Sequence, residues 1–146
     1  MNKDKELLLK DLSARLPYHV RCKIWLKDGT TEEGPLDLEH NYGNVLQDAF
    51  YYNKIKDIKP YLRPMSSMSE EEKEELLDRL PKYWSLEIDK LGDLYFDICD
   101  ACYPDIELLT DIIDWLNAHH FDYRGLIKKG LAIAVTEENN PYERRK

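Results

Sequence analysis

The sequence lacks the features that mark several large classes of protein. No apolar run approaches the roughly 18 residues that a membrane-spanning helix needs. The 146 residues include only 3 cysteines, and this odd count argues against a secreted disulfide framework. The N-terminus, MNKDKELLLKDL, has neither an uninterrupted apolar core nor a small-residue cleavage site, so it is not typical of a signal peptide. These absences predict a soluble cytoplasmic protein.

Motifs that bind phosphates or activate nucleophiles are also missing. The glycine patterns GxxxxGK[ST] and GxGxxG do not occur, and no serine lies in a GxSxG turn. The sequence therefore identifies no catalytic residue and no cofactor. An enzyme is the least favoured of the interpretations that follow.

Acidic residues outnumber basic ones, and the excess is confined to one half of the chain. Residues 1–66 carry 11 Lys/Arg and 10 Asp/Glu, whereas residues 67–146 carry 10 and 19, so the net charge of the chain is −8. A half-chain with net charge −9 repels a phosphate backbone. This half is better suited to a basic protein surface than to nucleic acid.

The first 60 residues change from a helical to an alternating apolar pattern. Leucines at helical spacing predict a helix over 3–16, which Pro17 ends. Apolar and polar residues then alternate over 19–26, as in a half-buried strand, and Asp28-Gly29 supplies a turn. Further short strands are predicted around 34–39, 44–48 and 54–58. Such a series of short antiparallel strands favours a strongly bent sheet or barrel.

The following segment begins with a proline-containing connector over 59–68, which we expect to be extended. Ser69 and Glu72 have the spacing of a capping box, so they predict the start of a helix that runs to about Leu80. Two alternating segments joined by a glycine-containing loop then predict a hairpin near 82–99.

A third helix is predicted from Pro104 onward, with an apolar stripe formed by Ile106, Leu109, Ile113 and Leu116. This helix should fray near His119-His120. Asp122 is then expected to cap a short helix over 123–129, which Gly130 terminates.

Together these elements predict an α+β fold. An N-terminal helix packs on a small SH3- or Sm-like antiparallel sheet or barrel over 1–62, and a mostly helical part with a hairpin follows over 63–146, either separately or as one continuous domain. The expected core residues are Leu12, Ile24, Leu26, Ile58, Trp84, Phe96, Ile113 and Leu116.

The stretch around the adjacent histidines contains the densest group of polar side chains that could bind a ligand or take part in a reaction. Neighbouring helical residues point about 100° apart, so His119 and His120 are poorly placed to bind one metal ion. We interpret the pair as the end of a helix and a structural corner. A binding surface or enzyme pocket remains an alternative, and it would be formed by His119, His120, Asp122, Tyr123 and Arg124.

Three cysteines and a histidine make a weaker candidate for a structural zinc site, with Cys99 and Cys102 in a CxxC and Cys22 and His19 elsewhere. Two arguments oppose it. Cys22 and His19 lie on opposite faces of the predicted strand. The acidic residues beside the CxxC raise the pKa of its thiols. We therefore expect no metal.

The run VRCKIWLKDGTTEEGPLDLEHNYGNVLQDA resembles the first half of an Sm-like barrel. The matching positions are Val20, Lys27, Asp28, Gly29, Gly34, Leu36, Asn44, Leu46, Asp48 and Ala49. Pro35 interrupts the pattern, one residue is inserted before Asn44, and the Arg-Gly loop that closes the family's RNA pocket is missing. The resemblance implies a barrel shape more than an RNA-binding ring.

Three other blocks, LLLKDLSARLPYHV, IKPYLRPMSSMSEEEKEE and IDWLNAHHFDYRGLIKKGLAI, resemble a family of small uncharacterised proteins. Those proteins come from phages, prophages and mobile elements of Bacteroides-type gut bacteria. The resemblance implies a cytoplasmic phage- or element-encoded protein and transfers no catalytic residues.

The favoured function is that of a non-enzymatic protein-binding module that modulates a host or phage protein. Its candidate surfaces are acidic and tyrosine-rich, formed by Glu70, Glu71, Glu72, Glu74, Glu75, Tyr51, Tyr52 and Tyr61. The alternative is nucleic-acid binding by the sheet, with Tyr51 and Tyr52 stacking on bases. The basic residues that would contact the phosphates of the nucleic-acid strand are Lys23, Lys27, Lys54, Lys56, Lys59 and Arg63.

Overall fold

The computed structural model describes residues 3–36, 55–80, 85–88, 94–97 and 106–142. It divides into two compact units. Unit 1 comprises residues 1–62 together with 124–146, and unit 2 comprises residues 63–123. The sequence-based division also separates the chain after residue 62, but it assigns 124–146 to the second part. In the structure the described residues 124–142 pack with the N-terminal unit.

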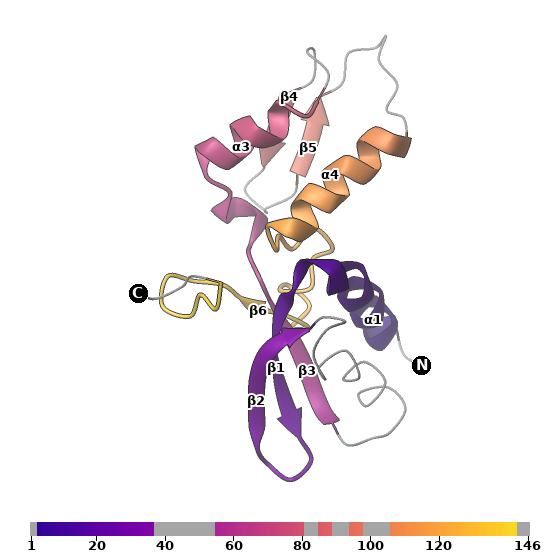
Figure 1. The fold of residues 1–146 in the computed structure, drawn as a ribbon, viewed down its shortest axis with the longest axis vertical. Coiled ribbons are helices and arrows are strands. Elements are labelled where there is room, and N and C mark those ends of the chain that lie inside the picture. Colours follow the sequence, from indigo (N-terminus) through magenta and orange to yellow (C-terminus); the bar gives the residue numbers. More distant parts are fainter. Residues whose placement is uncertain (1–2, 37–54, 81–84, 89–93, 98–105, 143–146) are drawn as a thin grey trace. The chain divides into compact units, whose positions relative to one another are not determined.

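Unit 1 contains one helix, a single helical turn and four strands within the described residues (Figure 1). These are α1 (Lys3–Arg15), the 3₁₀ turn η1 (Leu16–Tyr18), β1 (Val20–Leu26), β2 (Thr31–Leu36), β3 (Ile55–Leu62) and β6 (Ile133–Ala134). The strand order is β2-β1-β3-β6, with β1 antiparallel to both β2 and β3. The turn between β1 and β2 uses Gly29 at φ 93°, a backbone conformation that glycine adopts without steric cost.

The α+β class is confirmed, but the described sheet is open and does not close into a barrel. Its two edge strands in the described residues are β2 and β6. An edge position tolerates Pro35 within β2, because a proline there has no ladder amide to supply. The short β6 runs parallel to β3 and was not expected from the sequence. The strand predicted over 44–48 lies outside the described residues.

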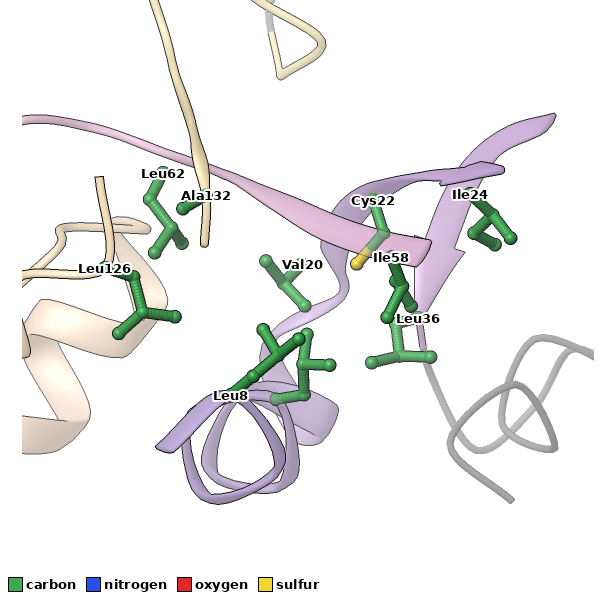
Figure 2. Packing of buried hydrophobic residues seen from close by; sticks show 10 residues of the cluster. Leu8, Val20, Cys22, Ile24, Leu36, Ile58, Leu62, Leu126 and Ala132 are labelled. Atoms are coloured by element: carbon green, nitrogen blue, oxygen red, sulfur yellow. The ribbon is translucent and has the colours of Figure 1, made fainter. Parts of the chain in front are cut away.

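The core of unit 1 forms where α1 packs on one face of the sheet (Figure 2). Alternate residues of β1 point to this face, as the sequence pattern predicts. The cluster also contains Leu126 and Ala132 from the C-terminal segment, which ties that segment to unit 1. Its buried members are Leu8, Leu12, Val20, Cys22, Ile24, Leu36, Ile58, Leu62, Leu126 and Ala132.

A buried ion pair lies on the same side of α1 as Leu8 and Leu12. Arg15 Nε donates to Asp11 Oδ2 at 2.8 Å, and both side chains are fully buried. Arg124 Nη1 donates to Asp11 Oδ1 at 3.1 Å. Because removing one partner would leave an uncompensated buried charge, these contacts hold α1 and the C-terminal segment in one arrangement.

Unit 2 contains the predicted capping box, the predicted hairpin and the helix predicted from Pro104 onward. Its elements are the 3₁₀ turn η4 (Met65–Ser67), α3 (Glu70–Leu77), β4 (Ser85–Ile88), β5 (Leu94–Asp97) and α4 (Ile106–Ala118). Ser69 accepts a hydrogen bond from the Glu72 amide at 3.1 Å, and the Glu72 carboxylate accepts one from the Ser69 amide at 3.0 Å. The strands β4 and β5 pair in antiparallel fashion. The described core of this unit comprises Met65, Met68, Leu76, Leu80, Ile112, Trp115, Leu116 and Phe121.

Several expectations need correction. Ile113 is 37% exposed, because α4 buries the face of Ile112, Trp115 and Leu116 instead. Residues 123–130 form turns, so Asp122 caps no helix. Of the other expected core residues, Leu12, Ile24, Ile58 and Leu116 are buried and Leu26 is partly buried. The side chains of Trp84 and Phe96 lie outside the described part of the structure.

Candidate functional site

The histidine corner, residues 119–123, is built by the C-terminus of α4. The His120 amide donates to Asn117 O at 3.0 Å and the Phe121 amide donates to Leu116 O at 3.0 Å. This pair of bonds, with His120 at φ 63°, forms a Schellman motif in which His120 occupies the left-handed position. Phe121 and Leu116 then meet in the core of unit 2. The corner predicted from the sequence is therefore a helix terminus.

Arg63 holds the corner from the other side. Its amide donates to His120 O at 2.7 Å, and its carbonyl accepts the Asp122 amide at 2.9 Å. Its guanidinium lies 4.1 Å from the Phe121 ring centroid and donates to both Glu72 carboxylate oxygens, at 2.7 and 2.6 Å. These hydrogen bonds lower the pKa of Glu72 to about 2. Arg63, expected to contact nucleic acid, is occupied within unit 2.

Trp115 occupies the centre of the corner. Its ring stacks on Phe121 with centroids 5.9 Å apart and lies 4.1 Å from the His119 ring. Its indole donates to Glu75 at 3.2 Å. Burial lowers the pKa of His119, while the nearby Glu72 and Glu75 carboxylates oppose the shift. A half-buried histidine packed on tryptophan stabilises the corner in its neutral form.

The other polar residues of the expected site are divided between the two units. Asp122 is buried, and the Tyr123 hydroxyl donates to Asn117 at 2.8 Å. Arg124 belongs to unit 1, where it contacts Asp11. The structure thus brings His119 and His120 together with Asp122 and Tyr123 as a helix end, and assigns Arg124 to a different role.

The five glutamates of α3 divide into two groups. Glu72 binds Arg63 and Glu75 accepts the Trp115 indole, so both support the packing of unit 2. Glu70, Glu71 and Glu74 are exposed, and Glu70 also pairs with Lys73 at 3.1 Å. Only these three remain as candidates for an acidic contact surface on α3.

Most of the apolar stripe of α4 that was expected to be buried is instead exposed. Ile106 is 83%, Leu109 46% and Ile113 37% exposed, and they are the large hydrophobic side chains that unit 2 exposes among its described residues. We call them the apolar row. A parallel acidic row runs along the helix beside it, formed by the exposed Glu107, Asp111 and Asp114. The sequence predicts this stripe, but Ile106, Leu109 and Ile113 are exposed and only Leu116 of the predicted stripe lies in the core.

The zinc candidates gain no geometric support from the described residues. Cys22 is 1% exposed, and burial first, then Asp11, raises the pKa of its thiol. His19 is exposed at the left-handed position before β1. No group of three potential metal ligands occurs in the part of the chain that the structure describes, and Cys99 and Cys102 lie outside that part.

The outer face of the sheet carries a group that sequence analysis only partly identified. Lys23 Nζ lies 5.4 Å and Lys59 Nζ 5.8 Å from the centroid of the Trp25 ring. Sequence alternation places Trp25 and Lys23 on this face, but only the strand register adds Lys59. We call these three residues the lysine–tryptophan cluster.

The tyrosines expected to be available for binding are differently placed. Tyr61 is 7% exposed, and its hydroxyl donates to Glu33 at 2.6 Å. Burial, followed by this hydrogen bond, raises the pKa of Tyr61 to about 12. Tyr51 and Tyr52, together with Lys54, lie outside the described residues. Lys27 and Lys56 are exposed in unit 1.

Comparisons with known proteins give a uniform result. No family model, curated protein or solved structure matches this chain. Within the described residues, no helix is both long and apolar enough to cross a membrane. The arrangement of charge and apolar surface therefore carries the functional argument.

Charge follows the two units more closely than it follows the two halves of the sequence. Unit 1 carries 16 Lys/Arg and 13 Asp/Glu, a net charge of +3, whereas unit 2 carries 5 and 16, a net charge of −11. These values account for the chain's −8. The two units therefore carry net charges of opposite sign.

Proposed function

We propose that this protein is a non-enzymatic protein-binding module that binds its partner through the exposed face of α4. The observation that carries the proposal is the exposure of the apolar row on that helix. An exposed apolar patch bordered by polar residues is typical of a protein interaction site. The complementary partner is an amphipathic helix with one apolar and one basic row.

The spacing of the two rows supports this choice of partner. The apolar row has the spacing i, i+3, i+7 and the acidic row has the spacing i, i+4, i+7, so each follows one line along the helix. A partner helix laid along α4 can therefore bury apolar side chains while its lysines or arginines meet the acidic row. The net charge of −11 on unit 2 increases the rate of encounter with such a partner.

The resemblance to proteins of phages and mobile elements supports a role in the host cytoplasm. A small module of that origin with an acid-bordered apolar face is suited to modulating a host or phage protein. This proposal replaces the α3 glutamates with α4 as the main contact surface, because two of those glutamates already have structural contacts.

The test uses model helical peptides in place of the unidentified partner. One peptide has a leucine row beside a lysine row, and the control peptide has the same composition in scrambled order. The peptide is titrated into isotope-labelled protein, and the amide chemical shifts are recorded by NMR. The first peptide should bind and change the chemical shifts of residues centred on α4. Replacing both Leu109 and Ile113 by serine should weaken binding about 100-fold or more, since each buried aliphatic side chain contributes about 1.5–3 kcal/mol.

A matched control uses the other acidic helix. Reversal of Glu107, Asp111 and Asp114 to lysine should abolish binding, whereas reversal of Glu70, Glu71 and Glu74 should weaken it only slightly. Equal binding of the scrambled peptide, or shifts centred on α3, would contradict the proposal.

A further inference from the structure

The lysine–tryptophan cluster forms a second surface in the other unit. Trp25 lies on β1 two residues after Lys23, so both side chains point to the face of the sheet opposite the core. Lys23 lies directly opposite Lys59 of β3. The result is a half-buried indole ring with two ammonium groups near it.

Two like charges directly opposite each other destabilise a sheet, so the Lys23–Lys59 pair needs an explanation. Contact with the Trp25 ring offsets part of the repulsion by cation–π attraction. Neither lysine forms an ion pair with a carboxylate in the part of the chain described by the structure. Both ammonium groups therefore keep their capacity to bind an anion.

The carboxylates on the same face have other hydrogen-bond partners. Glu33, opposite Lys23 on β2, accepts the Tyr61 hydroxyl. Asp57, opposite Trp25 on β3, accepts the amide of Ile58 at 2.9 Å. Arg21 adds a third basic side chain to this face, and unit 1 as a whole carries a net positive charge.

We propose that the outer face of β1 and β3 binds single-stranded nucleic acid, with Trp25 stacking on a base and Lys23 and Lys59 binding the adjacent phosphates. An aromatic ring within a basic surface supplies both interactions that such ligands require. Lysine ammonium groups on flexible stems can move from the ring to a phosphate when a base takes their place. This site is independent of the α4 face and of the peptide partner proposed for it.

Fluorescence polarisation of a labelled oligothymidine of about 15 nucleotides tests the site on the full chain. Trp25→Leu should weaken binding about ten-fold, while Trp25→Phe, which keeps a stacking ring, should retain most of it. Removing both lysines as Lys23→Ala/Lys59→Ala should lower the salt slope by about 1.4, because each neutralised phosphate of a single strand contributes about 0.7.

The matched control is Lys128→Ala/Lys129→Ala, which removes the same charge from exposed positions elsewhere in unit 1 and should leave affinity and salt slope nearly unchanged. Circular dichroism of each variant establishes that it is folded. Polyglutamate and polyphosphate provide anions without bases and should bind far more weakly. The proposal is overturned if these polymers bind as tightly as the oligonucleotide, if folded Trp25→Leu binds normally, or if no oligonucleotide binds at low salt.

Discussion

Replacing Tyr142 by phenylalanine removes a single oxygen atom that joins two strands of unit 1. The Tyr142 hydroxyl accepts a hydrogen bond from the Arg21 amide at 3.0 Å and donates one to Tyr61 O at 2.6 Å. The pairing of β1 with β3 reaches Cys22 and Pro60, one position away from these two groups. The hydroxyl therefore takes the place of a ladder bond at the next position along the strands.

The expected cost follows from the two backbone groups that lose their partner. A net intramolecular hydrogen bond contributes about 1 kcal/mol, and a buried amide without an acceptor costs about 1–3 kcal/mol. Both groups are only partly buried, so water recovers some of this loss. We expect Tyr142→Phe to lower the free energy of unfolding of unit 1 by about 2 kcal/mol. Burial also raises the pKa of Tyr142, which agrees with a hydroxyl held away from water.

Urea denaturation combined with amide hydrogen exchange measures this effect separately in each unit. The Arg21 amide should exchange much faster in Tyr142→Phe, and the amides of Cys22 and Ile24 should report the change in global stability of unit 1. Tyr61→Phe is the matched control, because it also removes one phenolic oxygen but frees only the exposed Glu33 carboxylate. We expect that control to cost less than about 1 kcal/mol.

The reasoning fails if Tyr142→Phe and Tyr61→Phe cost the same, or if exchange at Arg21 is unchanged. Either result would mean that the hydroxyl contributes no more than a surface group, and that the two strands hold together at this position without it.

Two further predictions concern the corner of unit 2. The Arg63 hydrogen bonds hold the pKa of Glu72 below its ordinary value of 4.5, at about 2, so the stabilisation is complete above about pH 4.5 and is lost as pH falls toward 2. Glu72→Gln should therefore destabilise unit 2 by about 1–2 kcal/mol near neutral pH, and urea midpoints should show this difference from wild type vanishing in acid; a difference independent of pH would contradict it. His120→Gly should raise the stability of unit 2 by about 0.5–1 kcal/mol, because glycine occupies the left-handed position without strain. A fall in the thermal midpoint of that variant would mean that the imidazole contributes more than the strain costs.

Short-range patterns in the sequence predicted the local structure well. The capping box of Ser69 and Glu72, the alternation of β1 and the turn at Asp28-Gly29 all depend on residues within a few positions of one another. Such local interactions have nearly the same geometry in any fold. The α+β class followed from them.

Features that depend on distant partners were predicted poorly. Helix α4 has two apolar stripes at similar spacing, one with Ile112 and Trp115 and the other with Leu109 and Ile113. Its periodicity alone does not determine which of the two faces the core. The strand β6 is only two residues long, too short to produce a pattern. Residues 123–130 contain Gly125 and Gly130, both at φ 75°, which favour turns over the predicted helix.

The same contrast between local and long-range features applies to the candidate sites. The helix end at His119-His120 is a local feature, and the sequence identified it as a corner. The pairing of Arg63 with Glu72 and the approach of Lys59 to Trp25 depend on how connector and strands pack. Outward alternation of Trp25 beside Lys23 was nevertheless visible in the sequence and is the signal that could have identified that cluster.

The division of unit 1 into two chain segments has a consequence for synthesis. Residues 63–123 are contiguous, so every described core residue of unit 2 is available as soon as Phe121 has left the ribosome. Unit 1 must wait for Leu126, Ala132 and Tyr142, although most of its residues are made first. The middle of the chain can thus finish folding before its beginning does, and the nascent β1–β3 sheet lacks these contacts until Tyr142 has been released.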